Sequence, residues 1–151
     1  MTTPPLILPV ALARQIESEG AAAYPNECCG ILFGRDIQAN GSVRRVVEQL
    51  LPVANVFEAE EQYHRFSISP KQLMDAERMA VDGGRLVLGF YHSHPDYPAK
   101  PSEYDRGHAW PFYSYIIVSI AKRRAVDLTS WVLDDGTEQF NPQNVNVVEF
   151  E

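Results

Sequence analysis

The segment from residue 86 to residue 91 constrains the fold of this chain more than any other. Its sequence, LVLGFY, is apolar apart from Gly89, and a cluster of polar residues, His92-Ser93-His94-Pro95, follows it directly. A short, continuous apolar run is typical of a strand that lies inside a sheet. We therefore expect a central strand that ends in chemically reactive side chains.

Three segments predict helices. An amphipathic pattern begins at Pro9 and ends between residues 20 and 25. A second pattern begins at Ser69-Pro70 and stops at Gly83-Gly84, where glycine can end a helix in the left-handed conformation. Ser102 is a good N-cap for a short third helix that reaches Ala109.

Other apolar runs predict strands, and the residues between them predict how the strands connect. The expected strands are 29–34, 43–51, 65–68, 113–120, 126–133 and 145–150. Asn40-Gly41 predicts a hairpin between the first two, closed by Pro52, and the acidic segment 54–64 is expected to be a solvated loop. This order of elements predicts a single α/β (α+β) domain over residues 1–151, with a mixed β-sheet flanked by helices.

The charge of the chain excludes some classes of partner. Thirteen Lys and Arg residues stand against twenty Asp and Glu residues, which gives a formal net charge of −7. Because such a chain repels phosphate groups, we expect neither nucleic acid nor a membrane surface as a partner. The apolar stretch 6–13 is interrupted by Pro9 and is far shorter than the roughly 20 residues that span a bilayer. It also lacks the basic residues of a signal peptide.

The only two cysteines, Cys28 and Cys29, are neighbours in the sequence. Adjacent cysteines are poorly placed to form a disulfide with each other, and neither has another partner in the chain. We therefore expect free thiols and a reducing, cytoplasmic location. The expected role of both residues is packing as small apolar side chains, and the alternatives are a thiol nucleophile or a metal ligand.

Residues 92 to 105 contain side chains with the spacing of a metal site. His92 and His94 are two residues apart, so both imidazoles project from one face of a strand and can converge on one ion. Ten residues separate His94 from Asp105, which the short helix can direct back toward the end of the strand. Two histidines and one carboxylate leave a tetrahedral ion with an open position, as in catalytic zinc sites.

Hydrolysis at such a site also requires a general base that is not itself a metal ligand. Glu27 is the candidate for this role. It lies between the amphipathic helix and the apolar run that begins at Cys29. A carboxylate is unusual in such a place unless it faces a polar cleft.

Each candidate also has a structural interpretation. His92 and His94 could line a polar groove without a metal. Ser102 and Asp105 have the spacing of a capping box, so both could simply cap the short helix, and Ser102 could cap it while taking part in chemistry. His108 lies three residues after Asp105 and could reach the surroundings of the metal.

Two aromatic residues flank the histidines and the aspartate. Tyr97 and Trp110 could line a groove next to these residues, and the alternative is that both belong to the core.

The sequence resembles the JAMM motif of the MPN+ zinc metallopeptidases at Glu27, His92-Ser93-His94-Pro95, Ser102 and Asp105. The spacing His-x-His-x(10)-Asp is met in full. The segment PNECCG, residues 25–30, resembles the glutamate segment of the short prokaryotic members. The likeness extends over residues 9 to 135. In its compact size the chain is similar to the Mec+-type sulfur-carrier-protein hydrolases.

This resemblance implies a fold, a metal and a reaction. The fold is the MPN/JAMM fold, which is similar to the cytidine deaminase architecture. The implied ligands of one Zn²⁺ per chain are His92, His94 and Asp105. Glu27 is implied to activate a water molecule as the fourth ligand, and Ser102 to stabilise the oxyanion. The implied substrate is an amide or isopeptide bond at the C-terminus of a ubiquitin-like protein, and a ThiS/MoaD-type sulfur carrier or its C-terminal adduct is the expected partner.

The main alternative is a non-catalytic MPN-type interaction scaffold that retains zinc. Such relatives typically lack one or more motif residues, and none is missing here. A RadC-type relative usually has asparagine between the histidines and a glycine soon after the proline, and Ser93 and Asp96 depart from that pattern. A zinc deaminase requires a His-x-Glu and a Pro-Cys-x-x-Cys segment, which the adjacent cysteines do not provide.

Overall fold

One eight-stranded mixed sheet, in the order β7-β6-β5-β4-β2-β3-β1-β8, organises the chain. The computed structural model describes residues 3–149. The strands are β1 (Leu6–Pro9), β2 (Cys29–Ala39), β3 (Ser42–Val53), β4 (Leu86–Pro95), β5 (Ser114–Ala121), β6 (Arg124–Leu133), β7 (Phe140–Gln143) and β8 (Val145–Val148). The helices are α1 (Val10–Ala23), α2 (Pro70–Asp82) and α3 (Glu103–Gly107), with a 3-10 turn, η1 (Ala59–Glu61).

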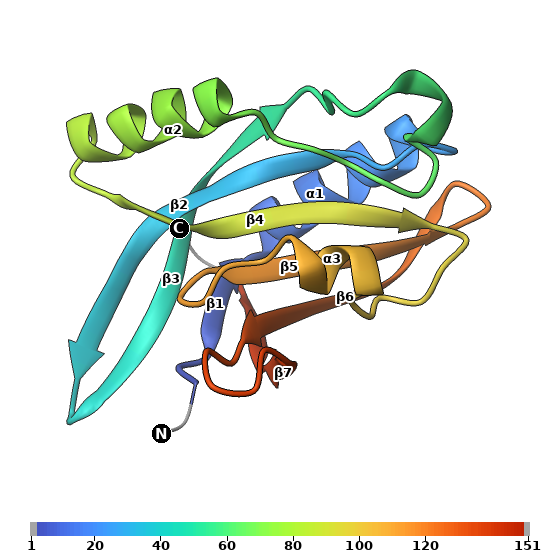
Figure 1. Cartoon of the computed structure of the whole chain (residues 1–151). Coiled ribbons are helices and arrows are strands. Elements are labelled where there is room, and N and C mark those ends of the chain that lie inside the picture. Colours follow the sequence, from blue (N-terminus) through green and yellow to red (C-terminus); the bar gives the residue numbers. More distant parts are fainter. Residues whose placement is uncertain (1–2, 150–151) are drawn as a thin grey trace.

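Helices α1 and α2 cover opposite faces of this sheet, and each face has its own core (Figure 1). On the α1 face, Ile16 packs against Leu88 and Tyr91 of β4, all fully buried. On the α2 face, Ala76 and Ala80 of the helix pack in the core that contains Phe90. Because β4 is buried from both sides, its sequence is apolar on both faces, as the sequence predicts.

A bulge in β4 decides which of its side chains share a face. The pairing of β4 with β2 shifts between Leu32 and Phe33, which pair with Gly89 and Val87, so that Leu88 has no partner in the register. The extra residue reverses the alternation along the strand. Phe90, His92 and the residues that alternate with them are thereby placed on the α2 face, where the groove described below lies.

The three predicted helices are confirmed. Ser69 caps α2 in a full capping box, and Ser102 does the same for α3. At the end of α2 the left-handed residue is Gly84, at φ +70°, whereas Gly83 has a negative φ. The second glycine is therefore the one whose conformation ends the helix.

Most of the predicted strands are confirmed, and three details are wrong. Pro52 does not close the hairpin, because β3 continues to Val53 and Pro52 pairs with Gly30. Residues 65–68 form no strand, because this extended segment has no sheet partner. The short strands β1 and β7 were not predicted, because β1 continues directly into α1 and the sequence of β7, FNPQ, has no apolar alternation. The last predicted strand is β8, and its end at Phe150 lies outside the described residues.

Within residues 3–149, no helix is both long enough and apolar enough to cross a membrane.

At Gly34, strands β2 and β3 lie too close together for a side chain. A Cβ atom at this position would lie 1.9 Å from the carbonyl oxygen of Val46 and 2.7 Å from Cδ1 of Leu88. Because backbone cannot yield as a flexible side chain does, Gly34→Ala should lower the free energy of unfolding by about 3 kcal/mol or more. Chemical denaturation measures this loss. Gly107→Ala is the control, because its new methyl group would meet nothing within 4 Å, and equal stabilities of the two variants would contradict the prediction.

Candidate metal centre

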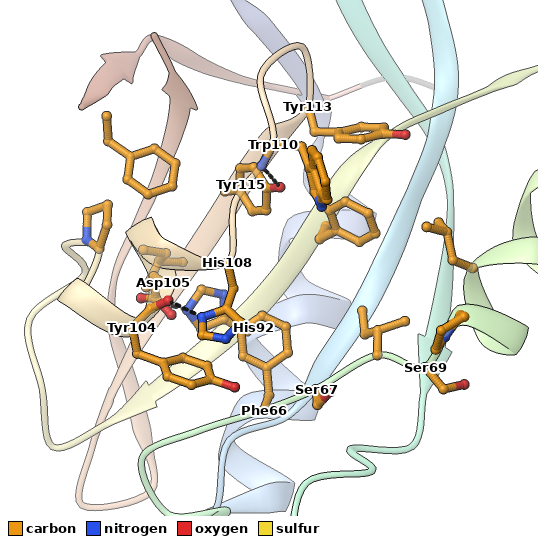
Figure 2. A pocket seen from close by; sticks show the side chains of 17 residues that line it. Phe66, Ser67, Ser69, His92, Tyr104, Asp105, His108, Trp110, Tyr113 and Tyr115 are labelled. Atoms are coloured by element: carbon orange, nitrogen blue, oxygen red, sulfur yellow. Dashed lines mark hydrogen bonds and ion pairs between the residues drawn. The ribbon is translucent and has the colours of Figure 1, made fainter. Parts of the chain in front are cut away.

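The end of β4 brings the two predicted histidines together. His92 and His94 are both 1% exposed, and their Nε2 atoms lie 3.1 Å apart. The Oδ2 atom of Asp105, on α3, lies 3.3 Å from the first of these nitrogens and 3.1 Å from the second. Figure 2 shows His92 and Asp105 side by side at the wall of a pocket. The three candidate ligand atoms therefore converge on one point.

The loop after β4 fixes the tautomer of His94. Its Nδ1 lies 2.8 Å from the carbonyl oxygen of Pro98, which can only accept a hydrogen bond, so Nδ1 carries the proton. The Nε2 atom then presents its lone pair to Asp105 and His92. The loop itself is held in place, because the Oγ1 of Thr129 donates to the carbonyl oxygen of Ala99 over 2.7 Å. The orientation of this imidazole is thus set by the fold.

The ring of His92 is held by packing instead. Phe66 stacks on it with ring centroids 4.4 Å apart and an interplanar angle of 23°. Its Nδ1 atom is buried and has no hydrogen-bond partner within residues 3–149. Burial lowers the pKa of His92, which keeps the imidazole neutral and its nitrogens able to bind a metal.

Helix α3 aims Asp105 at the histidines through its cap. Ser102 Oγ accepts from the backbone N–H of Asp105 over 3.0 Å, and Asp105 Oδ2 accepts from the backbone N–H of Ser102 over 2.9 Å. Burial works to raise the pKa of Asp105, but its contacts with the His92 and His94 imidazoles and the hydrogen bond from the backbone N–H of Ser102 outweigh it and hold the pKa well below its usual range. The capping box thus holds an ionised carboxylate next to the two histidines.

This set of donors fits a small divalent cation. Four ligands in a tetrahedron at about 2.0–2.1 Å from Zn²⁺ lie roughly 3.3–3.4 Å from one another. The three separations here are 3.1, 3.3 and 3.1 Å. Two neutral imidazoles and one carboxylate are also the ligand types that zinc takes. The three side chains could therefore hold one zinc ion and leave a fourth position open.

Glu27 is a buried carboxylic acid beside this cluster. It is 5% exposed, and its Oε1 atom has no hydrogen-bond partner in the part of the chain that the structure describes. Burial, with a smaller contribution from the negative charge of Asp105, raises the pKa of Glu27 from 4.5 to about 9. An unpartnered buried carboxyl is costly for stability, and such groups are concentrated at functional sites.

The backbone of Glu27 is tied to the irregular segment 54–69. Its N–H donates to the carbonyl oxygen of Gln62 over 2.7 Å, and its own carbonyl oxygen accepts from Nδ2 of Asn55 over 3.3 Å. The same amide group accepts from the N–H groups of Phe57 and Ser67 and donates to the carbonyl oxygen of Arg65, at 3.0 Å each. The side chain of Asn55 therefore links the acid to the segment that carries Phe66.

A second link runs from Glu27 to β4. The residue that follows it, Cys28, donates its backbone N–H to Oγ of Ser93 over 2.8 Å, and the N–H of Ser93 donates to the carbonyl oxygen of Cys28 over 3.2 Å. Ser93 lies between the two histidines and is fully buried. The position of Glu27 relative to the histidines is thus fixed by Ser93, which lies on the same strand as the histidines.

The two cysteines are free thiols in the structure. Burial raises the pKa of Cys28 to about 11 and the pKa of Cys29 to about 12. Both thiols therefore stay protonated near neutral pH, which argues against a role as thiolate nucleophiles. Packing is the role that their positions support, since Cys29 is buried and Cys28 packs against the core on the α1 face.

An apolar groove of about 320 Å³ is lined by two of the three candidate ligands, His92 and Asp105. Its walls come from the start of α2, from α3, and from the segments around β4 and β5 (Figure 2). The aromatic residues that line it are Phe66, Phe90, Tyr104, Trp110, Tyr113, Tyr115 and Phe140. His108 also lines the groove, stacked on Tyr104 with centroids 4.0 Å apart. Tyr97 does not line it, and its ring contacts the edge of His94 instead.

The sequence indicated the three ligand candidates, the acid and Ser102. The structure brings the three ligand candidates together, and two of them, His92 and Asp105, line this groove. The sequence did not indicate the contributions of Asn55, Phe66 and Ser93 to the geometry. Ser93 stands between the two histidines, and this position was the one available signal. Asn55 and Phe66 lie in a segment with no periodic pattern, so only the folded chain shows what they contact.

Known proteins share the sequence pattern and the fold. Residues 9–134 match the prokaryotic homologues of the JAB domain. The desampylase of Haloferax volcanii is 38% identical over 103 residues, which cover 67% of this chain and 68% of that protein. A Desulfitobacterium hafniense protein superposes with a TM-score of 0.79 at 27% identity, covering 96% of this chain and 94% of the other. A JAB1/MPN domain protein from Archaeoglobus fulgidus superposes with a TM-score of 0.58 at 19% identity, covering 99% and 100%.

The raised pKa of Glu27 predicts how stability depends on pH when no metal is bound. Between pH 4.5 and about pH 9 the folded chain keeps a proton on Glu27 that the unfolded chain releases. The contribution of protonated Glu27 to the free energy of unfolding is therefore fully present below pH 4.5 and is lost as the pH rises toward about 9. Relative to Glu27→Gln, the chelator-treated protein should lose roughly 2–4 kcal/mol between about pH 5.5 and about pH 8.5.

Urea denaturation of both proteins at several pH values measures this difference. Glutamine keeps the size of the side chain and cannot ionise, so all other titrating groups cancel in the comparison. Parallel pH dependences for the two proteins would show that Glu27 is ionised in the folded chain.

Proposed function

The chain belongs to the family of prokaryotic homologues of the JAB domain, and from this premise we propose that it is a zinc-dependent hydrolase of ubiquitin-like proteins. The family match confirms the JAMM resemblance and the expected mixed-sheet fold. The bond cleaved is an amide or isopeptide bond at the C-terminus of the partner. The observation that carries the proposal is the convergence of His92, His94 and Asp105 beside the buried, unpartnered acid of Glu27.

The proposed zinc ligands are Nε2 of His92, Nε2 of His94 and Oδ2 of Asp105. When bound, zinc would supply Lewis-acid activation of a water molecule and of the scissile carbonyl group. Each ligand is held from outside the cluster, by Phe66, by the carbonyl oxygen of Pro98 and by the cap of α3. Such outer contacts keep ligands oriented for the metal.

Glu27 is the proposed general base. It accepts the proton that the attacking water loses and delivers it to the leaving amine, which completes the hydrolysis without net change in the side chain. The burial that raises its pKa strengthens it as a base, and a bound cation would lower the pKa from about 9 toward neutral pH. Both effects suit a group that must gain and lose a proton in each turnover.

Ser102 is the proposed oxyanion stabiliser. Its Oγ accepts a hydrogen bond from the N–H of Asp105, and a serine hydroxyl can donate its own proton at the same time. The capping contact therefore places a donor next to a zinc ligand, and both of the roles that the sequence allows for Ser102 are compatible.

The proposed substrate is the C-terminal tail of a ThiS/MoaD-type sulfur carrier, or an adduct on that tail. An extended tail fits the groove because the groove is mostly apolar and is lined by two of the three candidate ligands, His92 and Asp105. Trp110, which lines the groove and is exposed, is the proposed contact for this tail. The likeness to a protein named desampylase supports hydrolysis as the reaction class.

The test of this function combines metal analysis with an assay of cleavage. Protein loaded with zinc should contain about one equivalent per chain and should release the C-terminal adduct of a ThiS/MoaD-like carrier, and a chelator should abolish the release. Zinc without cleavage would support a scaffold that retains the metal, or a different ubiquitin-like substrate. Absence of zinc after reconstitution would refute the proposal.

Two substitutions separate the base from the ligands. Glu27→Ala should retain zinc and lower kcat by about 10²–10⁴-fold, because a general base contributes to turnover and not to metal binding. His92→Ala should lose the zinc and the activity together, because it removes one of three protein ligands. Zinc content and kcat are measured on both purified variants. Unchanged turnover in Glu27→Ala would remove this residue from the mechanism.

A further inference from the structure

Arg45 is a buried arginine on the face of the sheet opposite the groove. Its side chain is only about 6% exposed. It lies on β3 two residues before Val47, which belongs to the core on the α1 face, so both side chains point to that face. Buried charges require partners, because an unpaired ion inside a protein is very costly.

The guanidinium group of Arg45 has partners on three other segments. Its Nη1 donates to the carbonyl oxygen of Phe112 over 2.6 Å, to Oγ of Ser114 over 3.2 Å and to the carbonyl oxygen of Leu88 over 3.4 Å. Its Nε and Nη2 donate to the carboxylate of Asp36 over 3.0 and 3.3 Å. The side chain therefore reaches from β3 past β2 to the first residues of β4 and β5.

The segment that Arg45 holds has an unusual backbone. Phe112 has a φ of +85°, which a residue with a Cβ adopts only when its surroundings impose it. Its carbonyl oxygen is hydrogen-bonded to Arg45, and its ring lies over the guanidinium group, 4.6 Å from the centroid. The turn at Phe112 thus directs this ring toward Arg45, while Trp110 and Tyr113 line the groove on the other face.

On the groove side, Ala109 and Tyr113 of the same segment pack against the core that contains Phe90, and one backbone group is hydrogen-bonded. The backbone N–H of Trp110 donates to the hydroxyl oxygen of Tyr115 over 2.9 Å, as Figure 2 shows. The indole itself is 68% exposed at the mouth of the groove. Because so little of this side chain is buried, its position depends on the backbone of residues 109–113, and Arg45 holds that backbone from the opposite face.

We propose that Arg45 is a positioning residue for substrate: by holding Phe112 from the opposite face, it sets the place of Trp110 at the mouth of the groove. The inference rests on the proposed function, since it assigns the substrate contact to Trp110. The ligand Asp105 lies on α3, which has its own cap, so the metal centre is held independently of this contact. Loss of the Arg45 contacts should weaken substrate binding and leave zinc binding intact.

The experiment uses Trp110 as its own reporter. The chain has two tryptophans, so Trp131→Phe leaves Trp110 as the single fluorophore, and this background is first checked for zinc content and activity. Into it is placed Arg45→Lys, which keeps the charge but cannot reproduce the planar fork that bonds Asp36 and Phe112 together. The control is Arg44→Lys, the same change at the neighbouring, exposed position.

The expected result has two parts. Arg45→Lys should lower the fluorescence anisotropy of Trp110 and increase its quenching by acrylamide. It should also raise KM for the carrier by about tenfold, with kcat within about twofold of the background and zinc content unchanged. Arg44→Lys should change none of these quantities. A merely structural role for Arg45 would lower the melting temperature without this separation of KM from kcat.

Two outcomes would overturn the proposal. The first is an anisotropy that does not respond to Arg45→Lys, and the second is an altered anisotropy with an unchanged KM. If Arg45→Lys does not fold, Asp36→Asn weakens the ion pair from its more exposed side and should give the same changes at smaller amplitude. If the background protein cleaves no carrier, the proposed function fails, while the anisotropy still decides whether Arg45 holds Trp110.

Discussion

The candidate site depends on the hydrogen-bonded pairing of β4 with its two neighbours, β2 and β5. The backbone hydrogen bonds of this strand set the positions of His92 and His94, and a β-bulge near its start determines the face that they share. Through Ser93 the same strand also holds Cys28, and thereby the backbone next to Glu27. One strand therefore positions two ligand candidates and the acid, with the precision that regular secondary structure provides.

The remaining parts of the site lie in irregular segments. Hydrogen bonds of side chains and loop carbonyl groups hold these segments in place of strand pairing. Asn55 uses its amide group to hold four backbone groups of three segments, including the carbonyl oxygen of Glu27. The carbonyl oxygen of Pro98 and the capping box of Ser102 orient His94 and Asp105. Satisfied polar networks of this kind give loops a unique conformation. They offset the cost in stability of the carboxyl of Glu27, whose Oε1 atom is buried without a partner among the described residues.

The two faces of the sheet have different roles, and one side chain connects them. The α2 face carries the groove and the candidate ligands, whereas the α1 face carries the apolar core that contains Ile16. Arg45 connects them, because it lies on the α1 face and bonds the segment whose other residues line the groove. A buried arginine is therefore part of the framework of the groove although it lies on β3, which β2 separates from the strand of the histidines.

The sequence by itself determined the local elements and the identity of the reactive residues. The helices, most strands and the caps at Ser69 and Ser102 follow from periodicity and capping chemistry, which act over a few residues. The spacing of His92, His94 and Asp105 indicated their convergence because a strand and a short helix have fixed geometries. The motif also carried the family resemblance, which the family match confirms.

Tertiary structure alone decided how these elements meet. The β4 bulge, the short strands β1 and β7, and the unpaired segment 65–68 depend on which neighbours are available, and no local pattern contains that information. The contacts of Asn55 and Arg45 join residues that are 28 and 67 positions apart in the chain. Local chemistry selects the reactive side chains, but their surroundings are built by long-range packing, which only the folded chain defines.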